Sequence, residues 1–331
     1  MQILKNPHID YLRWKWPALA LSAVVILAGL ATIFTRGIPM GIEFAGGTAV
    51  VAAFDQDVAL DPVRDAINRA FGTESVVHSF GDPGQHQIMI RVPQVGDESG
   101  TALSEVVDKV KASLQSAGLP KFDIPYYEAV GPAVGQQLRT QGFWAAVLAL
   151  GGILLYITFR YQFSFAIGAI IATVHDLLVT LAFLAFFQYD MTLNVIAALL
   201  TIAGFSSNDT IVIFDRVREN LRGMRRDSLN DIFHLSDNQT KSRTIITSGT
   251  AMLSAVALYL FGGDVLRGFA FTLIVGMISG TYSTIFIAIA VVSMWRGSGP
   301  LKAAARAPAA PPSAPQQPTR KSKAQRKARA S

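Results

Sequence analysis

The sequence contains no cysteine among its 331 residues, and charged residues make up only 16% of it. The absence of cysteine excludes disulfide bonds. The charged fraction lies well below the roughly 25% that is typical of soluble domains. Hydrophobic residues, in contrast, make up 51% of the chain. This composition disfavours a soluble globular protein and indicates helices that lie in a membrane.

Six segments have the length of about 20 apolar residues that a helix needs to cross a bilayer. They are 17–35, 141–159, 163–187, 192–214, 244–262 and 268–295. The first has the basic flank of a secretory signal peptide, but it is long for such a segment and no small-residue cleavage site follows it. We therefore predict that it is a retained anchor and that the protein is a polytopic α-helical membrane protein.

Lysine and arginine residues concentrate on one side of these segments. Three of them precede the first segment, seven lie within residues 215–243, and nine follow Trp295, where no acidic residue occurs. The short loops of the opposite side carry only Arg267. The positive-inside rule then predicts a cytoplasmic N-terminus at residues 1–16, a cytoplasmic C-terminus, and an exported segment 36–140.

Residues 296–331 are rich in alanine, proline and basic residues and lack apolar periodicity. This composition predicts a disordered cytoplasmic tail whose charge holds it near anionic membrane lipids. Contact of the tail with ribosomes or nucleic acid is an open alternative. The net charge of +6 comes mainly from this tail, so we expect no nucleic-acid binding by the protein as a whole.

The exported segment contains six candidate elements in the order β-α-β-β-α-β. Strands are predicted at 49–54, 75–80, 87–92 and 122–130, and helices at 61–71 and 103–117. This order is typical of ferredoxin-like α+β domains. No metal, phosphate or nucleophile motif occurs here, so we predict a binding or lever domain without cofactor or metal, rather than an enzyme. Residues suited to hinges flank the domain, namely Gly46, Gly47, Gly131 and Pro132.

Two carboxylates lie inside predicted membrane segments. Asp176 directly follows His175 near the middle of 163–187, and Asp209 lies in 192–214. An ionisable side chain inside a membrane helix costs roughly 2.5–3.5 kcal/mol on insertion scales, and such residues usually face the bundle interior and serve an ion or substrate pathway. We therefore predict functional roles for both carboxylates. His175 either tunes the protonation of Asp176 or only forms a hydrogen bond with it.

Arg243 begins a polar stripe at the start of segment 244–262. The residues that support the two carboxylates are expected to be Ser206, Asn208, Thr247 and Thr250. The alternative is that these side chains only pack or bond between helices, and that Arg243 only reaches the lipid headgroups. We expect Arg243 to pair with Asp209. The arginine would favour the ionised carboxylate while burial favours the neutral acid, and this opposition suits a proton carrier.

With these residues in view, the chain resembles the SecF family of the bacterial Sec protein-export machinery over about residues 1–296. The motifs that carry the resemblance are GIEFAGGT (41–48), VGPAVGQQL (130–138), VHD (174–176), AALLTIAGFSSNDTIVIFDRVREN (197–220), RTIITSGT (243–250), LFGGDVLRGF (260–269) and GTYSTIFIA (280–288). The block at 197–220 is the longest and most specific. Glu43 stands where the family often has aspartate, which is a mild departure.

The resemblance implies a multi-pass protein of the inner membrane that forms half of a transporter of the resistance-nodulation-division superfamily. SecD would supply the other half beside the SecYEG channel, with YajC and YidC as further partners. The family is thought to use the proton motive force to promote preprotein translocation after the ATP-driven step. Transferred to this chain, the proton pathway would involve Asp209 and Arg243, with Asp176 as a further member.

Two other functions remain open from the residues alone. The chain could be a half-transporter of the same superfamily that exports small molecules or lipids. It could also be a non-transporting assembly or sensor subunit, in which the buried charges are structural. Loss of proton-dependent export on neutralising Asp209, with the complex intact, would separate protein export from the structural role. Drug or lipid sensitivity without a secretion defect would favour the half-transporter.

Overall fold

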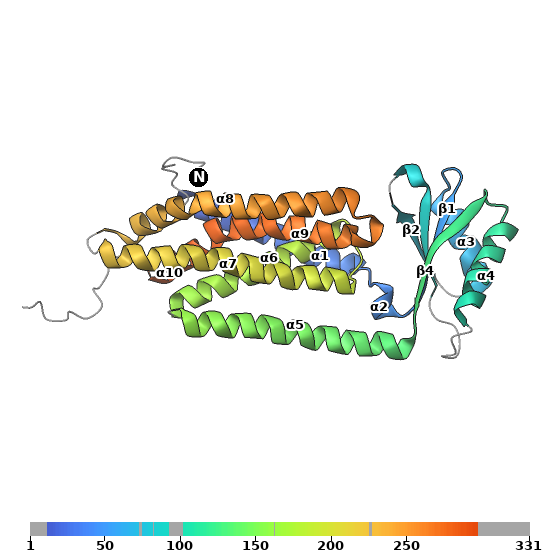
Figure 1. Cartoon of the computed structure of the whole chain (residues 1–331), viewed down its shortest axis with the longest axis horizontal. Helices are drawn as coiled ribbons and strands as arrows, with labels where there is room; N and C mark the ends of the chain where they lie inside the picture. The colour runs from blue at the N-terminus through green and yellow to red at the C-terminus, as the bar shows by residue number, and fades with distance from the viewer. Residues whose placement is uncertain are drawn as a thin grey trace, which may run out of the picture.

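The structure is a computed structural model and describes residues 12–72, 75–81, 83–92, 102–161, 163–224 and 227–296. A bundle of long helices and a small α+β domain lie end to end along the longest axis of the molecule (Figure 1). The predicted disordered tail, apart from its first residue, and most of the predicted N-terminal segment 1–16 lie outside the described residues.

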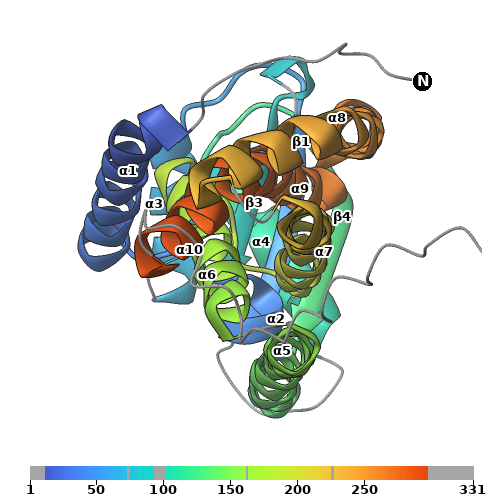
Figure 2. The same ribbon diagram turned by 90° about the vertical axis from the view of Figure 1, so that its left-hand side faces the viewer.

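Six helices are long and apolar enough to cross a membrane, which confirms the predicted polytopic helical class. The first five are α1 (Lys15–Arg36), α5 (Pro132–Arg160), α6 (Phe163–Phe186), α7 (Leu193–Gly223) and α8 (Leu229–Phe261). The sixth consists of α9 (Asp264–Ser283), the π-helical turn η3 (Thr284–Ala288) and α10 (Ile289–Arg296). The short elements η1 (Leu12–Trp14) and α2 (Ile42–Ala45) flank α1. Viewed along the bundle, α1 and α5 lie at its periphery (Figure 2).

Three helices extend well beyond the predicted apolar segments: α5 and α8 begin earlier, and α7 ends later. Residues 132–140, which we expected in the connection to the exported domain, form the beginning of α5. A proline is favourable in that first turn because its missing N–H would have no helical partner. α8 begins at Leu229, where Ser228 caps the helix by accepting from the backbone N–H of Asp231 at 3.2 Å. Apolar content thus located the membrane-spanning parts but not the polar ends of these helices.

The exported domain has the predicted βαββαβ order. Its elements are β1 (Gly47–Phe54), α3 (Leu60–Phe71), β2 (Val76–Phe80), η2 (Pro83–Gln85), β3 (Gln87–Val92), α4 (Ala102–Ser116) and β4 (Phe122–Val130). The strands pair antiparallel in the order β2-β3-β1-β4, as in ferredoxin-like domains. α3 and α4 cover one face of the sheet, where Val50, Ile67, Ile90, Val110 and Leu114 are fully buried.

The opposite face of the sheet is docked on the membrane helices. Arg91 of β3 forms an ion pair with Asp190 in the loop between α6 and α7, and it donates a hydrogen bond to the carbonyl of Met40 at 2.9 Å. The backbone N–H of Gly41 donates to the carbonyl of Met191 at 2.8 Å. The connection from α1 to the exported domain is therefore paired with the α6–α7 loop.

Two of the predicted hinge residues have backbone conformations that favour glycine. Gly46 and Gly47 have φ angles of 73° and 106°, between α2 and β1. Residues with a Cβ rarely adopt these angles. Gly131 has an extended backbone and caps α5 ahead of Pro132. Movement at these positions stays a prediction.

Small residues bring α7 and α9 into close contact. A Cβ atom on Gly276 would lie 2.1 Å from Cδ1 of Ile202, and one on Gly280 would lie 3.3 Å from Cβ of Ser206. These glycines form the GxxxG pattern that lets membrane helices approach closely. The approach places the Ser206 side of α7 directly against α9.

Replacing Gly276 by alanine should lower the midpoint of thermal unfolding, because the new methyl group must displace the Ile202 side chain. Overpacking of this kind typically costs about 1–3 kcal/mol. The measurement is thermal unfolding of the full chain in detergent. Gly204→Ala is the matched control, since no atom lies within 4 Å of a Cβ at that position in α7. A Gly276→Ala midpoint at or above that of the control would contradict the close packing.

Candidate functional site

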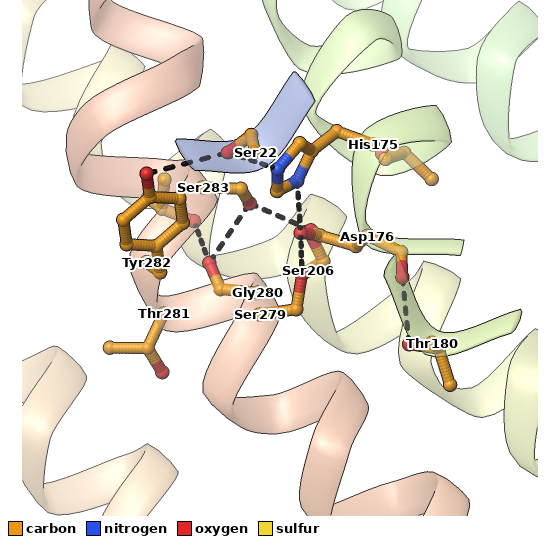
Figure 3. A network of polar contacts seen from close by, with 12 residues as sticks. Ser22, His175, Asp176, Thr180, Ser206, Ser279, Gly280, Thr281, Tyr282 and Ser283 are labelled. Atoms are coloured by element: carbon orange, nitrogen blue, oxygen red, sulfur yellow. Dashed lines mark hydrogen bonds and ion pairs between the residues drawn. The ribbon is translucent and has the colours of Figure 1, made fainter. Parts of the chain in front are cut away.

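Asp176 in α6 is fully buried and accepts four hydrogen bonds (Figure 3). Its Oδ1 lies 3.0 Å from Nδ1 of His175 and accepts from Ser279 at 2.7 Å. Its Oδ2 accepts from Ser206 at 2.5 Å and from Ser283 at 2.7 Å. These donors come from α6, α7 and α9, so one carboxylate joins three helices.

The helical repeat explains how α9 supplies two of these donors. Ser279 and Ser283 are four residues apart and therefore lie on the same face of the helix. Gly280, between them, leaves room for α7, with the Oδ2 atom of Asp176 3.7 Å from the position of its Cβ. The small side chains of α9 thus create a polar pocket that fits one carboxylate.

His175 extends the polar contacts from Asp176 to α1. Its Nε2 lies 2.9 Å from Oγ of Ser22, and the ring of Tyr282 stacks on the imidazole with centroids 6.0 Å apart. The Tyr282 hydroxyl donates to the carbonyl of Ala18 at 2.7 Å. This series of contacts is the main polar attachment of α1 that Figure 3 shows.

Asp209 in α7 is also buried but is held much less firmly. Ser248 of α8 donates to its Oδ2 at 3.2 Å, and no other hydrogen-bond partner of Asp209 is found in the described part of the chain. Fewer hydrogen-bond partners therefore hold the side chain of Asp209 than hold that of Asp176. A carboxylate that keeps one weak partner can gain or lose a proton with little rearrangement.

The expected direct pairing of Arg243 with Asp209 is not formed among the described residues. Arg243 is exposed, and no hydrogen bond or ion pair joins it to Asp209, although its charge acts on that carboxyl group through space. Arg243 and Ser248 are five residues apart, which is a rotation of about 140° around a helix. Because Ser248 faces Asp209, Arg243 must point elsewhere.

The other predicted supporting residues divide between two environments. Ser206 contacts Asp176 rather than Asp209. Asn208, Thr247 and Thr250 are exposed, and the two threonines donate to backbone carbonyls of their own helix. The residues that sequence reasoning missed are Ser22, Ser248, Ser279, Tyr282 and Ser283. The spacing of the two α9 serines shows that they share a face, but nothing local indicates that this face meets Asp176.

Exposed polar groups form a stripe along one side of α8, within a segment that is apolar enough to span a membrane. Arg243, Thr247, Thr250 and Ser254 are all exposed along α8, and Asn208 is exposed on the adjacent α7. Polar residues in membrane helices usually face protein or water rather than lipid. This polar face of α7 and α8 therefore has the character of a surface that another membrane protein covers.

A cleft of about 340 Å³ lies between the α+β domain and the adjacent end of the helix bundle. It includes the Arg91–Asp190 ion pair and His78, whose Nε2 lies 3.9 Å from Oδ2 of Asp190. Burial lowers the pKa of His78; the charge of Asp190 opposes this effect and that of Arg91 adds to it. The neutral imidazole is therefore the form that fits the docked arrangement.

Comparison with known proteins places these features in a family. Residues 109–298 match the family of the protein export membrane protein SecD/SecF, C-terminal, and residues 31–58 match the SecD/SecF GG motif. The chain is 40% identical over 296 residues to the protein translocase subunit SecF of Desulfurispirillum indicum, covering 88% of this chain and 93% of that protein. It is 43% identical over 294 residues to SecF of Pseudomonas aeruginosa, with coverage of 88% and 92%.

Among solved structures, the chain is similar to the crystal structure of SecDF, a translocon-associated membrane protein, from Thermus thermophilus. The TM-score is 0.78 and the sequence identity is 32%. The similarity covers 88% of this chain but only 39% of the SecDF chain. The present chain therefore spans less than half of that larger protein.

Docking of the exported domain should weaken as the pH falls below about 6.5, the ordinary pKa of histidine. Because the pKa of His78 is lowered in the docked form, the undocked form binds more protons in this range and gains in population. The measurement is the distance between spin labels attached to Lys111→Cys in α4 and Val147→Cys in α5. Because the sequence has no native cysteine, the labels react only at these two positions. In His78→Gln, the distance distribution should not depend on pH over this range. The same pH dependence in that control would show that His78 is not the group that makes docking depend on pH.

Replacing Asp176 by asparagine should destabilise the bundle more than the same change at Asp209. The amide keeps one acceptor oxygen and brings an NH₂ group toward hydroxyl donors, so buried serines lose their acceptor at about 1–3 kcal/mol for each unsatisfied group. At Asp209 only the 3.2 Å bond from Ser248 is affected. Thermal unfolding of both variants in detergent tests the difference. If Asp209→Asn lowers the unfolding midpoint as much as Asp176→Asn or more, the hydrogen bonds of Asp176 do not stabilise the bundle more than that of Asp209.

Proposed function

The chain belongs to the SecF proteins of the SecD/SecF family, and from this membership we propose that it pairs with SecD to drive preprotein export with the proton motive force. It is a multi-pass protein of the inner membrane that takes part in Sec-dependent protein export. In this role it acts as a transport accessory subunit rather than as an enzyme. The SecYEG channel, YajC and YidC are its further proposed partners.

The polar face of α7 and α8 is the observation that carries the partnership with SecD. Arg243, Thr247, Thr250 and Asn208 are exposed there, although lipid is an unfavourable neighbour for such groups. The solved SecDF chain is long enough to contain a second membrane half, since the present chain covers 39% of it. A SecD bundle placed against this face would remove these polar groups from lipid, in the manner of a transporter built from two repeats.

Asp209 is the proposed proton carrier because it lies behind this face with one weak hydrogen bond. Protonation would disturb only the contact with Ser248 at 3.2 Å. Arg243 would supply positive charge at the interface with SecD and bias Asp209 toward the ionised form when a proton leaves. Asp176, with hydrogen-bond partners on three helices, is assigned a different role as a buried side chain that holds the helices together.

The exported domain is the proposed contact for the translocating preprotein on the outer side. The distribution of lysine and arginine supports an orientation with both termini in the cytoplasm. The docking contacts of Arg91 and the α6–α7 loop would then lie at the outer surface of the membrane. Reversible docking there would transmit movement between the bundle and the preprotein.

Replacing Asp209 by asparagine should abolish the stimulation of export by the proton gradient while the ATP-driven step persists. The amide cannot titrate but keeps the shape and hydrogen-bonding capacity of the side chain. Arg243→Lys should retain more of the stimulation than Arg243→Ala, because lysine keeps the positive charge, but less than the parent protein, because an ammonium lacks the planar donor fork of arginine. The measurement is preprotein import into inverted membrane vesicles with and without a gradient.

The matched control is Glu219→Gln, which neutralises an exposed carboxylate at the cytoplasmic end of the same helix and should leave stimulation unchanged. Subunit abundance and co-purification with SecD are measured in parallel. Normal stimulation by Asp209→Asn at normal abundance would eliminate the carrier role. Loss of SecD from the purified complex in that variant would instead assign Asp209 to assembly.

A further inference from the structure

A cavity of about 370 Å³ lies between α5 and its neighbours α6 and α7, and we call it the α5 groove. α5 contributes Gly142, Ala146 and Leu150 to its walls, and their spacing of four residues keeps them on one face of the helix. Leu177 of α6 and Leu199 of α7 are among the residues that line it from the bundle. All five residues are only half-buried, so the walls of the groove are accessible to a further molecule.

The groove is a local feature of the packing of α5. Near the end of the helix, Ile157 is 1% exposed and belongs to the same apolar core as Phe165 and Phe214. About three turns earlier, the side chain that faces the bundle is the single methyl group of Ala146. The helix is therefore held against the bundle at Ile157, while the space beside Ala146 stays unfilled by the described chain.

The lining of the groove suits hydrocarbon rather than water. Every described residue that lines it is apolar except Arg139. A bound water needs two to four polar partners, which such walls do not offer. An empty space of this size would also forfeit the dispersion contacts of its walls. Because α5 is apolar enough to span a membrane, lipid chains are the hydrocarbon that lies beside it.

Arg139 lies at the end of the groove that is nearer to the α+β domain, since α5 begins at Pro132 directly after that domain. It is exposed, and no hydrogen bond or ion pair of its guanidinium group is found within the described ranges. The helix rises about 16 Å from Arg139 to Leu150. One leaflet of the hydrocarbon core is about 15 Å thick, half of the full core. The groove therefore matches one leaflet in depth, with a cation at the level of the lipid phosphates.

We propose that the α5 groove binds one phospholipid, with an acyl chain between α5, α6 and α7 and its phosphate at Arg139. A guanidinium group matches a phosphate in both charge and geometry, because it donates two parallel hydrogen bonds. A protein helix fits the groove less well. With side chains it is about 10–12 Å across, so that one turn fills roughly 400–600 Å³ and exceeds the whole cavity.

The site lies apart from the face that we assign to SecD. α5 and α8 lie on opposite sides of the bundle in both views (Figures 1 and 2), so a partner that covers the polar stripe of α8 leaves the groove open. Only Gly131 separates α5 from β4 of the α+β domain. The bound lipid thus packs beside the helix that continues directly into the sheet, and the proposal does not depend on the export function.

Native mass spectrometry of the full chain, titrated with dioleoyl phosphatidylglycerol in mild detergent, tests the contact with phosphate. Arg139→Gln should weaken binding about fivefold, the effect of one basic residue near a lipid surface. Arg36→Gln is the matched control, because Arg36 is an exposed arginine at the end of α1 on the same side of the bundle. Dioleoylglycerol, which lacks the phosphate, should bind the parent and Arg139→Gln equally. Equal affinity of these two proteins for phosphatidylglycerol would overturn the assignment of Arg139.

Filling the groove tests the position of the acyl chain in the same titration. Ala146→Phe places a ring in the space between the helices and should abolish the tight binding of one lipid. Ala145→Phe is the matched control, because Ala145 is exposed and does not line the groove. Thermal unfolding shows whether each variant is folded, and Ala146→Leu replaces Ala146→Phe if the latter is not. Undiminished lipid binding by a folded groove-filling variant would overturn the proposal.

The chain purified together with SecD distinguishes a lipid from a protein occupant. If the groove holds a phospholipid, the complex should retain one lipid that Ala146→Phe removes and Ala145→Phe does not. If the chain alone binds this lipid but the complex excludes it, a helix of the partner occupies the groove. That result would overturn the proposal for the assembled protein, whatever the outcome of the export experiments on Asp209.

Discussion

The burial of one carboxyl group, that of Asp176, inside a membrane bundle sets the constraint on which much of this structure depends. Asp176 needs donors on both oxygens, and it obtains them from three different helices. To bring these donors within reach, α7 and α9 must approach closely, which the glycines at 276 and 280 permit. The hydrogen bonds of Asp176 therefore depend on the close packing of α7 against α9. A substitution that separates these helices would also break the hydrogen bonds.

The two membrane carboxylates show how surroundings give one chemical group different roles. Asp176 has hydrogen-bond partners on both oxygens, and all of them come from within the chain. Asp209 has one long hydrogen bond and lies near a face of α7 and α8 that exposes polar side chains. The first setting suits a group that stabilises the fold, and the second is the setting in which we propose proton exchange.

The exported domain is attached by contacts that differ in kind from those of the bundle. Its own core is apolar and enclosed between the sheet and two helices. Its attachment relies on the Arg91–Asp190 ion pair and on backbone hydrogen bonds between the α1–β1 connection and the α6–α7 loop. The cleft beside these contacts contains the titratable side chain of His78. Such polar contacts at a water-accessible surface can break and re-form without unfolding either part, which suits the movement that we propose for this domain.

The sequence by itself determined the helical membrane class, the number of spans, the order of elements in the exported domain and the family. Hydropathy and periodicity are local properties, and each of these conclusions depends on residues close together in the chain. Local patterns could not show that Ser206, Ser279 and Ser283 meet Asp176, because these partners lie 30, 103 and 107 residues away from it. Nor could they show that Ser248 and not Arg243 faces Asp209, since the rotation of α8 is set by its packing against α7 and α9. Only the tertiary structure decided which polar groups share a site, because helix packing brings together residues whose neighbours in sequence carry no sign of the contact.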